Sequence, residues 1–129
     1  MEPEEALGRS IEAGDRRALA QGVTLVESAR PEDRVRAARL LETLREREPP
    51  ALRLAVTGPP GTGKSTLIDK LGGLLIAEGQ RIAVLAIDPT SQVTGGSILG
   101  DKTRMAGLLR DERAFIRPSP SGNAAGGVA

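Results

Sequence analysis

The sequence predicts an α/β fold: a parallel sheet with flanking helices, preceded by a helical segment. Two short runs, residues 51–58 and 81–88, have the near-continuous apolar character of strands that are covered on both faces. Between them, apolar residues recur at helical spacing, and a glycine-rich turn joins the first run to this helix. Strand, turn, helix and strand form a βαβ unit with a right-handed crossover. The pattern changes at residue 51, so a helical segment over 1–50 and an α/β domain over 51–129 are predicted.

Three helices are expected in the N-terminal segment. The first two span about 4–13 and 15–28, with Gly14 between them, and the third spans 31–48 and is ended by the two prolines that follow. One apolar stripe is expected along the third helix at three- and four-residue spacing, formed by Val35, Ala38, Leu40, Leu41 and Leu44. Charged residues occupy most other faces, so the segment is expected to pack on other protein rather than fold alone.

The helix of the βαβ unit is expected to begin near Lys64 and to end before Gly79, a residue suited to a C-cap. A shorter helix near 101–110 and a strand over 114–118 should follow, and residues 119–129 have no periodicity and are expected to be loop. The apolar positions of the helix that begins near Lys64 are Leu67, Ile68, Leu71, Leu74 and Leu75.

Composition excludes several kinds of chemistry. The 129 residues include no cysteine and no histidine, so disulfides, thiolate catalysis, histidine acid–base catalysis and ordinary zinc sites are excluded. A net charge of +1 does not favour nucleic acid or an acidic membrane surface as a partner, although the part after residue 50 carries +3. No apolar run approaches the ~20 residues of a membrane span, and the acidic N-terminus is unlike a signal peptide. A cytoplasmic protein is expected.

The glycine-rich turn matches the phosphate-binding P-loop pattern: Gly58, four residues, then Gly63, Lys64 and Ser65. Glycines let backbone N–H groups surround an anion, and the following helix directs its unsatisfied N–H groups at the same place. Lys64 is expected to reach the β- and γ-phosphates, and Ser65 to bind Mg²⁺. Chance should give the bare pattern in only roughly one chain in a few hundred. A nucleotide site is therefore predicted over Gly58, Pro59, Pro60, Gly61, Thr62, Gly63, Lys64, Ser65 and Thr66.

Two acidic residues after the second strand are candidate metal ligands. Asp88 ends that strand, at the carboxyl edge where α/β proteins bind ligands, and could meet the P-loop Mg²⁺. On spacing alone, this metal role is no more favoured than the alternative, in which Asp88 and the proline after it begin a turn. Asp101 is a second candidate, although the pattern alone favours it as the N-cap of the short helix.

Three stretches together resemble a known family: "GPPGTGKSTLID" (58–69), "LAIDPTSQVTGGSILGDKTRM" (85–105) and "AFIRPSPSG" (114–122) followed by "GGVA". They are similar to the methylmalonyl-CoA mutase-associated GTPases, also labelled MeaB- or ArgK-type proteins and LAO/AO transport ATPases. The N-terminal helical stretch is similar to the family's as well. The resemblance implies a SIMIBI-class P-loop GTPase that binds GTP and Mg²⁺ and chaperones an adenosylcobalamin-dependent mutase during cofactor loading and protection.

The resemblance also assigns roles to residues. Gly58 through Thr66 would hold the phosphates, with Lys64 and Asp88 as the catalytic candidates. Ser65, Asp88 and Asp101 would be the magnesium ligands, which strengthens the metal role of Asp101 over the cap. Family members are longer and carry a second switch, a guanine-reading motif and a dimerisation region. The chain is therefore expected to be the N-terminal part of such a GTPase. It would then be an incomplete P-loop NTPase that is inactive in hydrolysis by itself. Its full-length relatives are expected to be homodimers.

Two alternatives stay open at this point. The chain could belong to another class of P-loop ATPases, such as the AAA type, whose loops often read Gly-Pro-Pro-Gly-Thr-Gly-Lys. It could instead be a non-catalytic interaction module in which the helices of residues 4–48 carry the binding. Nucleotide preference separates the first alternative from a GTPase, and single-turnover hydrolysis tests the second.

Overall fold

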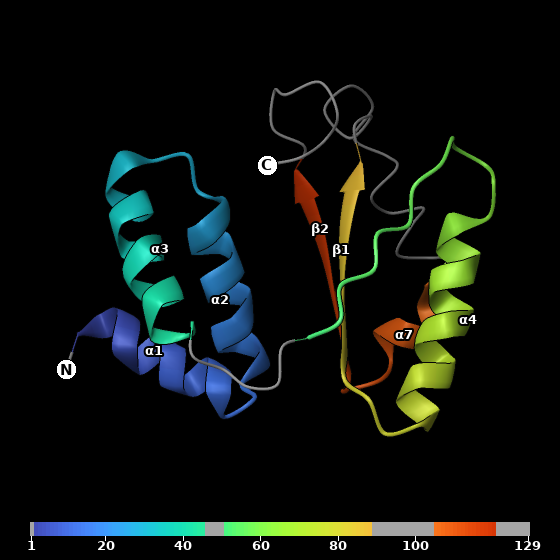
Figure 1. Ribbon diagram of the computed structural model, residues 1–129, viewed down its shortest axis with the longest axis horizontal. Coiled ribbons are helices and arrows are strands. Elements are labelled where there is room, and N and C mark those ends of the chain that lie inside the picture. Colours follow the sequence, from blue (N-terminus) through green and yellow to red (C-terminus); the bar gives the residue numbers. More distant parts are fainter. Residues whose placement is uncertain (1, 46–50, 89–104, 121–129) are drawn as a thin grey trace. The chain divides into compact units, whose positions relative to one another are not determined.

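The structure is a computed structural model that describes residues 2–45, 51–88 and 105–120. The chain divides into two compact units, Met1–Arg53 and Leu54–Ala129 (Figure 1). The first unit is helical, and the second contains helices and a two-stranded sheet.

The first unit is a three-helix arrangement of α1 (Pro3–Glu12), α2 (Arg16–Glu27) and α3 (Pro31–Thr43), in which every pair of helices is in contact. Its centre is Leu40, which is 1% exposed. Glycines allow the helices to approach closely here: a Cβ on Gly22 would lie 2.9 Å from Ile11 Cδ1 and 3.3 Å from Leu40 Cδ2. Close-packed interiors leave no room for such an extra atom.

The junction between α1 and α2 is built from two adjacent residues. Gly14 has a φ of +87°, and its N–H donates to the Ile11 carbonyl at 2.9 Å. The N–H of Asp15 donates to the Ser10 carbonyl at 3.0 Å, which completes a Schellman motif. The Asp15 side chain then caps α2 by accepting from the N–H groups of Arg17 at 2.8 Å and Ala18 at 3.2 Å. The same residue thus closes one helix and opens the next, and the predicted break at Gly14 is confirmed.

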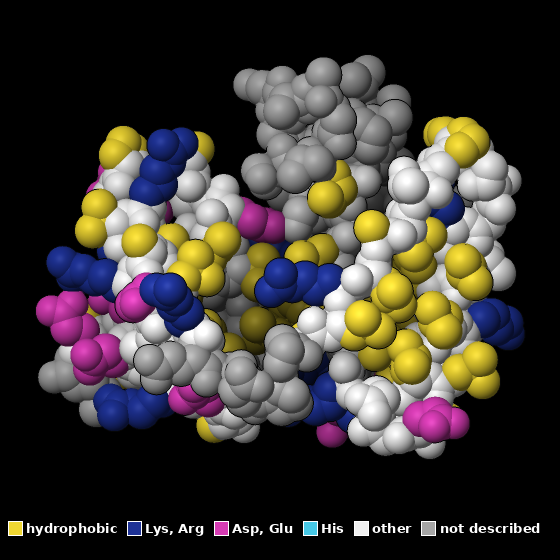
Figure 2. All heavy atoms as spheres, in the orientation of Figure 1, with side chains coloured by type: hydrophobic (Ala, Val, Ile, Leu, Met, Phe, Trp, Pro, Cys, Tyr) yellow, Lys and Arg dark blue, Asp and Glu magenta, His cyan; other side chains and the backbone are white. Residues whose placement is uncertain are grey.

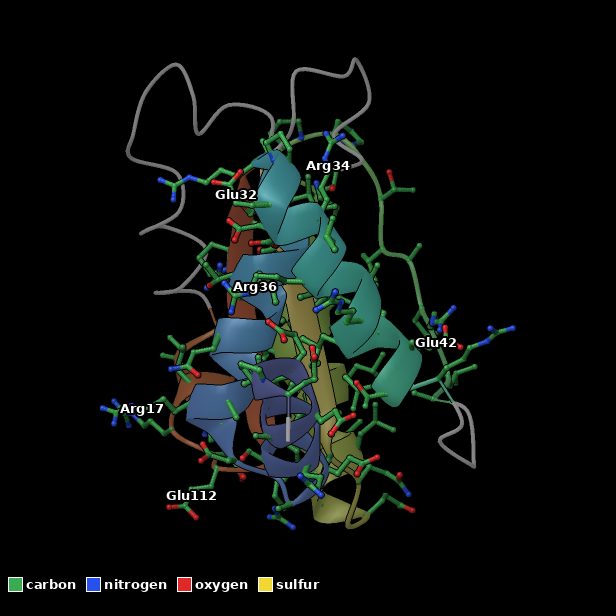
Figure 3. All side chains as sticks on the ribbon, turned by 90° about the vertical axis from the view of Figure 1, so that its left-hand side faces the viewer. Arg17, Glu32, Arg34, Arg36, Glu42 and Glu112 are labelled. Atoms are coloured by element: carbon green, nitrogen blue, oxygen red, sulfur yellow. The ribbon has the colours of Figure 1, made fainter. Side chains whose placement is uncertain are left out.

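An ion pair between a buried glutamate and a half-exposed arginine joins α1 to α3. Glu4 is 5% exposed, and its Oε1 accepts from Arg36 Nε at 2.7 Å. The hydrogen bond from Arg36 is the main reason that the pKa of the Glu4 carboxyl lies below its usual value. Arg36 Nη1 also lies 3.7 Å from Oδ1 of Asp33, which is on the same helix. Figure 3 labels Arg36 on this unit.

The predicted stripe on the third helix was partly wrong. Val35 and Leu41 are 57% and 52% exposed, and Ala38 is exposed as well. The buried positions of α3 are instead Ala37 and Leu40, and this helix is in contact with both α1 and α2. The helix also ends earlier than residue 48, at Thr43, whose hydroxyl donates to the Arg39 and Leu40 carbonyls at 3.0 and 2.8 Å. Such side-chain bonds compete with the helical ladder.

The second unit contains α4 (Lys64–Ala77), β1 (Ile82–Asp88), the short α7 (Ala106–Leu109) and β2 (Ala114–Pro120). The two strands are parallel and in register from Ile82 opposite Ala114 to Asp88 opposite Pro120. The helix that begins at Lys64 and the strand over 81–88 were thus predicted at nearly their observed positions. The helix predicted near 101–110 is observed as α7 over Ala106–Leu109, with residues 101–104 outside the described ranges. The strand predicted over 114–118 continues to Pro120, two residues into the stretch predicted as loop. The core of the unit is formed by Ile76, Leu108 and Ala114, with Ile68, Ile82, Val84 and Ile116 packed against them.

The predicted strand over 51–58 is absent: residues 51–59 have no regular secondary structure. Leu52, Leu54 and Val56 are 86%, 65% and 39% exposed. A strand exists only through hydrogen bonds to a neighbouring strand. In the described part of the chain, the two strands of the sheet pair with each other and not with this run. The expected βαβ unit from residue 51 to residue 88 is therefore not formed.

The expectation that β1 is covered on both faces was wrong for the described part of the chain. Side chains of β1 alternate between half-buried positions, such as Val84, and exposed ones. Leu85 and Ile87, on the more exposed face of this strand, are 60% and 47% exposed. The covered face is the one that α4 and α7 contact. A continuous apolar run therefore did not mean burial on both faces.

The apolar stripe predicted on α4 was also only partly right. Leu67 and Leu74 are 55% and 66% exposed, and hydrophobic side chains gather over α4 in Figure 2. The buried positions are Gly72 and Ile76. A Cβ on Gly72 would lie 2.7 Å from Ile82 Cδ1 and 2.8 Å from Leu108 Cδ1. The buried face of α4 is therefore the one that carries Gly72, which packs closely against Ile82 and Leu108.

Candidate phosphate-binding site

The turn before α4 has the backbone geometry that the P-loop pattern requires. Gly61 and Gly63 have φ values of +80° and +94°, in the left-handed region that side chains rarely adopt. A Cβ on either glycine would meet no atom within 4 Å, so φ rather than crowding requires glycine there. Space is therefore open beside the backbone of both residues, where an anion could approach.

The helix that follows presents its N-terminus at this turn. Gly63 is the N-cap of α4 and supplies no side-chain cap; its carbonyl accepts from the Leu67 N–H at 2.9 Å. The first N–H groups of a helix have no partner within the helix, and together with the helix dipole they favour an anion. The turn and the carboxyl ends of β1 and β2 lie at the same end of this unit (Figure 1).

Lys64 folds back over the turn. Its Nζ donates to the carbonyl oxygens of Gly58 at 2.7 Å and Pro59 at 2.8 Å. Thr62 Oγ1 donates to the same Pro59 carbonyl at 2.8 Å, so two side chains brace the turn. An ammonium has three donors, and these bonds use two of them. A positive charge is thereby fixed at the glycine-rich turn.

The structure brings most of the predicted site residues together. Gly58, Pro59, Pro60, Gly61, Thr62 and Gly63 form the turn, and Lys64, Ser65 and Thr66 form the first turn of α4. Asp88 is the last residue of β1, opposite Pro120. Asp101 lies outside the described residues. The roles assigned to these residues remain predictions.

The donors that are present suit magnesium when a triphosphate supplies the others. Within residues 2–45, 51–88 and 105–120, no group of three or more acidic, histidine or cysteine side chains could hold a metal by itself. Mg²⁺ does not require one, because it keeps several waters and binds through one or two protein ligands and substrate phosphates. The Ser65 hydroxyl at the start of α4 is an oxygen donor of the kind it uses.

Sequence reasoning missed the residues by which α4 packs against α7 and β1. Asp69 Oδ1, on the second turn of α4, accepts from the Leu108 N–H at 3.3 Å. Gly72 admits Leu108 and Ile82 to the same helix. One signal was available: Asp69 follows Ile68 within the helix, and an aspartate needs a partner if it is not fully exposed.

No helix in the described part of the chain has the length and apolar character that a membrane crossing requires.

Comparison with known proteins gives consistent matches. Residues 19–129 match the family described as "Methylmalonyl Co-A mutase-associated GTPase MeaB". The chain is 54% identical over 125 residues to a putative GTPase of Caulobacter vibrioides, covering 97% of this chain and 38% of the relative. It is 52% identical over 120 residues to the GTPase ArgK of Escherichia coli, covering 93% and 36%. A crystal structure of an LAO/AO transport system kinase matches with a TM-score of 0.71 and 40% identity, covering 92% of this chain and 34% of that one. The chain thus spans little more than a third of the length of these proteins.

Proposed function

The chain belongs to the methylmalonyl-CoA mutase-associated GTPase family, and from this premise we propose that it binds GTP together with Mg²⁺. The observation that carries the proposal is the turn from Gly58 to Lys64, with two left-handed glycines and an ammonium braced across it. Its α/β fold is that of a partial P-loop NTPase. The backbone N–H groups from Gly58 to Thr66 bind the phosphates, and Lys64 contacts the β- and γ-phosphates.

The metal belongs to the same proposal. Ser65 binds Mg²⁺ through its hydroxyl, and Asp88 and Asp101 are the carboxylates that bind it directly or through water. The bound ion neutralises charge on the phosphates. Support for Asp88 is its place at the carboxyl end of β1, the end at which the glycine-rich turn also lies. For Asp101 the support is the family resemblance.

The wider role that we propose is that of a chaperone for an adenosylcobalamin-dependent methylmalonyl-CoA mutase, which assists cofactor loading and protects the enzyme in the cytoplasm. The name of the family supports the association with a mutase. Homodimers are proposed for the longer relatives. For this chain we expect little or no hydrolysis, because no described residue is placed to position an attacking water.

Calorimetry with matched lysine variants tests nucleotide binding. Lys64→Ala removes the ammonium from the turn and should weaken GTP binding in Mg²⁺ by at least about 100-fold, because charge-assisted bonds to phosphate are lost. Lys70→Ala is the control, since Lys70 is exposed on the same helix and should leave affinity unchanged. Equal affinity of Lys64→Ala and the wild type would reject the site. A strong preference for ATP over GTP would instead favour a P-loop ATPase.

A second experiment tests the partner. Sedimentation of the chain with methylmalonyl-CoA mutase, in the presence of GTP or GDP, should show a complex whose amount depends on the nucleotide. No complex in any nucleotide state would reject the chaperone role for this chain without affecting the nucleotide site.

A further inference from the structure

The short helix α7 receives its N-terminal cap from a different helix. Its N-cap residue, Met105, makes no side-chain capping bond. Leu108 is its third residue, and the N–H at that position is one that an N-cap side chain ordinarily satisfies. Here the acceptor is Asp69 Oδ1 of α4, at 3.3 Å and 39 residues away in sequence. Asp69 therefore replaces the missing local cap.

The Asp69 carboxylate lies close to the backbone of α7, and Gly107 leaves room for it. A Cβ on Gly107 would lie 3.3 Å from Asp69 Oδ1 and 3.5 Å from Oδ2. Leu108 packs against Gly72 one turn further along α4, and both Met105 and Leu108 are 2% exposed. The helices α4 and α7 are in contact (Figure 1). The cap is thus part of a tight junction.

One face of α4 links this junction to the phosphate-binding turn. Residues spaced by four, three and four positions share a helix face, and here that face carries Ser65, Asp69, Gly72 and Ile76. Asp69 lies one turn from Ser65, and the N–H at position 69 bonds to the carbonyl at position 65 in an α-helix. The order of the first turn of α4 therefore determines where the Asp69 carboxylate stands.

Resting on the proposed function, we propose that Asp69 is a positioning residue that couples nucleotide binding at the turn to the attachment of α7. The first turn of α4 has no side-chain cap from Gly63, and uncapped helix ends fray. Phosphates bound to its N–H groups hold that turn in place, which strengthens the bond from Leu108 to Asp69. Coupling between two sites is reciprocal, so the attached α7 strengthens nucleotide binding by the same factor.

Hydrogen exchange and calorimetry on the full 129-residue chain test the coupling. In the wild type, Mg–GTP should raise the protection of the Leu108 amide by about fivefold, a factor typical of a helix cap. Asp69→Ala should abolish this rise and weaken Mg–GTP binding by the same factor. Asp69→Asn keeps an acceptor oxygen at this position and should retain both effects. Glu78→Ala, at the far end of α4, is the control for loss of an acidic residue and should behave as the wild type.

The outcomes separate this inference from the proposed function. No GTP binding by the wild type rejects both. Binding without a change at Leu108, or an Asp69→Ala variant that keeps the change, rejects the coupling alone. Loss in Asp69→Asn as well as Asp69→Ala also rejects it, because charge and not the cap would then be responsible. Should Asp69→Ala fail to fold, Gly107→Ala crowds the same carboxylate and should reduce the rise in protection; an undiminished rise would contradict the proposal.

Discussion

The two units differ in how their helices are completed. In the first unit, the junction between α1 and α2 is completed by local residues: Gly14 ends α1, and the Asp15 side chain caps α2. In the second unit, Asp69 caps α7 from 39 residues away, and the first turn of α4 has no side-chain cap from its N-cap residue. Most exposed large hydrophobic residues are also in the second unit, on α4, on one face of β1 and in residues 54–56.

This difference teaches where function is placed. A helix whose first N–H groups bond to a flanking side chain has fewer backbone donors left for a ligand at that end. The N-terminus of α4 receives no side-chain cap from Gly63 and begins at the glycine-rich turn, where we propose that phosphates bind. Four pairs of substitutions test the contrast, given from the largest expected effect to the smallest.

The strongest test breaks the centre of the helical unit. Leu40→Ala removes the side chain that is 1% exposed and should lower the free energy of unfolding by about 2–4 kcal/mol through lost burial and a cavity. The adjacent Leu41→Ala is the control, since Leu41 is 52% exposed, and should change it by less than about 1 kcal/mol. Urea unfolding followed by circular dichroism measures both. Similar losses in the two variants would show that α3 does not bury the face described.

In the second unit, two neighbouring glycines on α4 should respond in opposite directions. Gly72→Ala places a Cβ within 3 Å of Ile82 and Leu108 and should destabilise by about 1–2 kcal/mol, since overpacking outweighs the gain in helix propensity. Gly73→Ala meets nothing within 4 Å and should stabilise by about 0.5–1 kcal/mol. Chemical denaturation with a probe in this unit reports the difference. Stabilisation by both substitutions would contradict the close approach of α7 and β1.

The junction between α1 and α2 should contribute less to the free energy of unfolding than the core of either unit. Asp15→Ala leaves the first N–H groups of α2 without their side-chain acceptor and should reduce stability by about 1 kcal/mol. Asp15→Asn keeps a good capping group and should reduce stability by only a few tenths of a kcal/mol. Thermal unfolding compares the two. A loss as large for asparagine as for alanine would mean that the charge, rather than the cap, stabilises the junction.

The smallest effect concerns pH. Arg36 lowers the pKa of Glu4, so the stability from this pair is present above the ordinary glutamate pKa of about 4.3 and is lost as pH falls through the lower folded value. Glu4→Gln should therefore weaken the acid sensitivity of the first unit between pH 5 and pH 3. The exposed Glu5→Gln leaves the Arg36 pair intact and should retain the wild-type sensitivity. Urea midpoints across this pH range measure the effect, and identical slopes in all three proteins would contradict it.

Much of the fold was predictable because its signals are local. Gly14 and Gly79 end helices through a left-handed residue, and the glycines and lysine of residues 58–64 specify a phosphate-binding turn within a few positions. The position of β1 followed from its apolar run. Predictions that needed a distant neighbour were less successful: the strand over 51–58, the covering of both faces of β1, and the burial of Val35 and Leu67.

By itself, the sequence determined the three N-terminal helices, the turn with its lysine at the start of α4, and the positions of the two observed strands. Those features depend on φ preferences, caps and periodicity over short stretches of chain. Only the tertiary structure decided that Leu40 rather than Leu41 is buried, that β1 pairs with β2, and that Asp69 caps α7. Each of these depends on which remote surface comes into contact, and a helix or strand with apolar residues on several faces does not specify that choice.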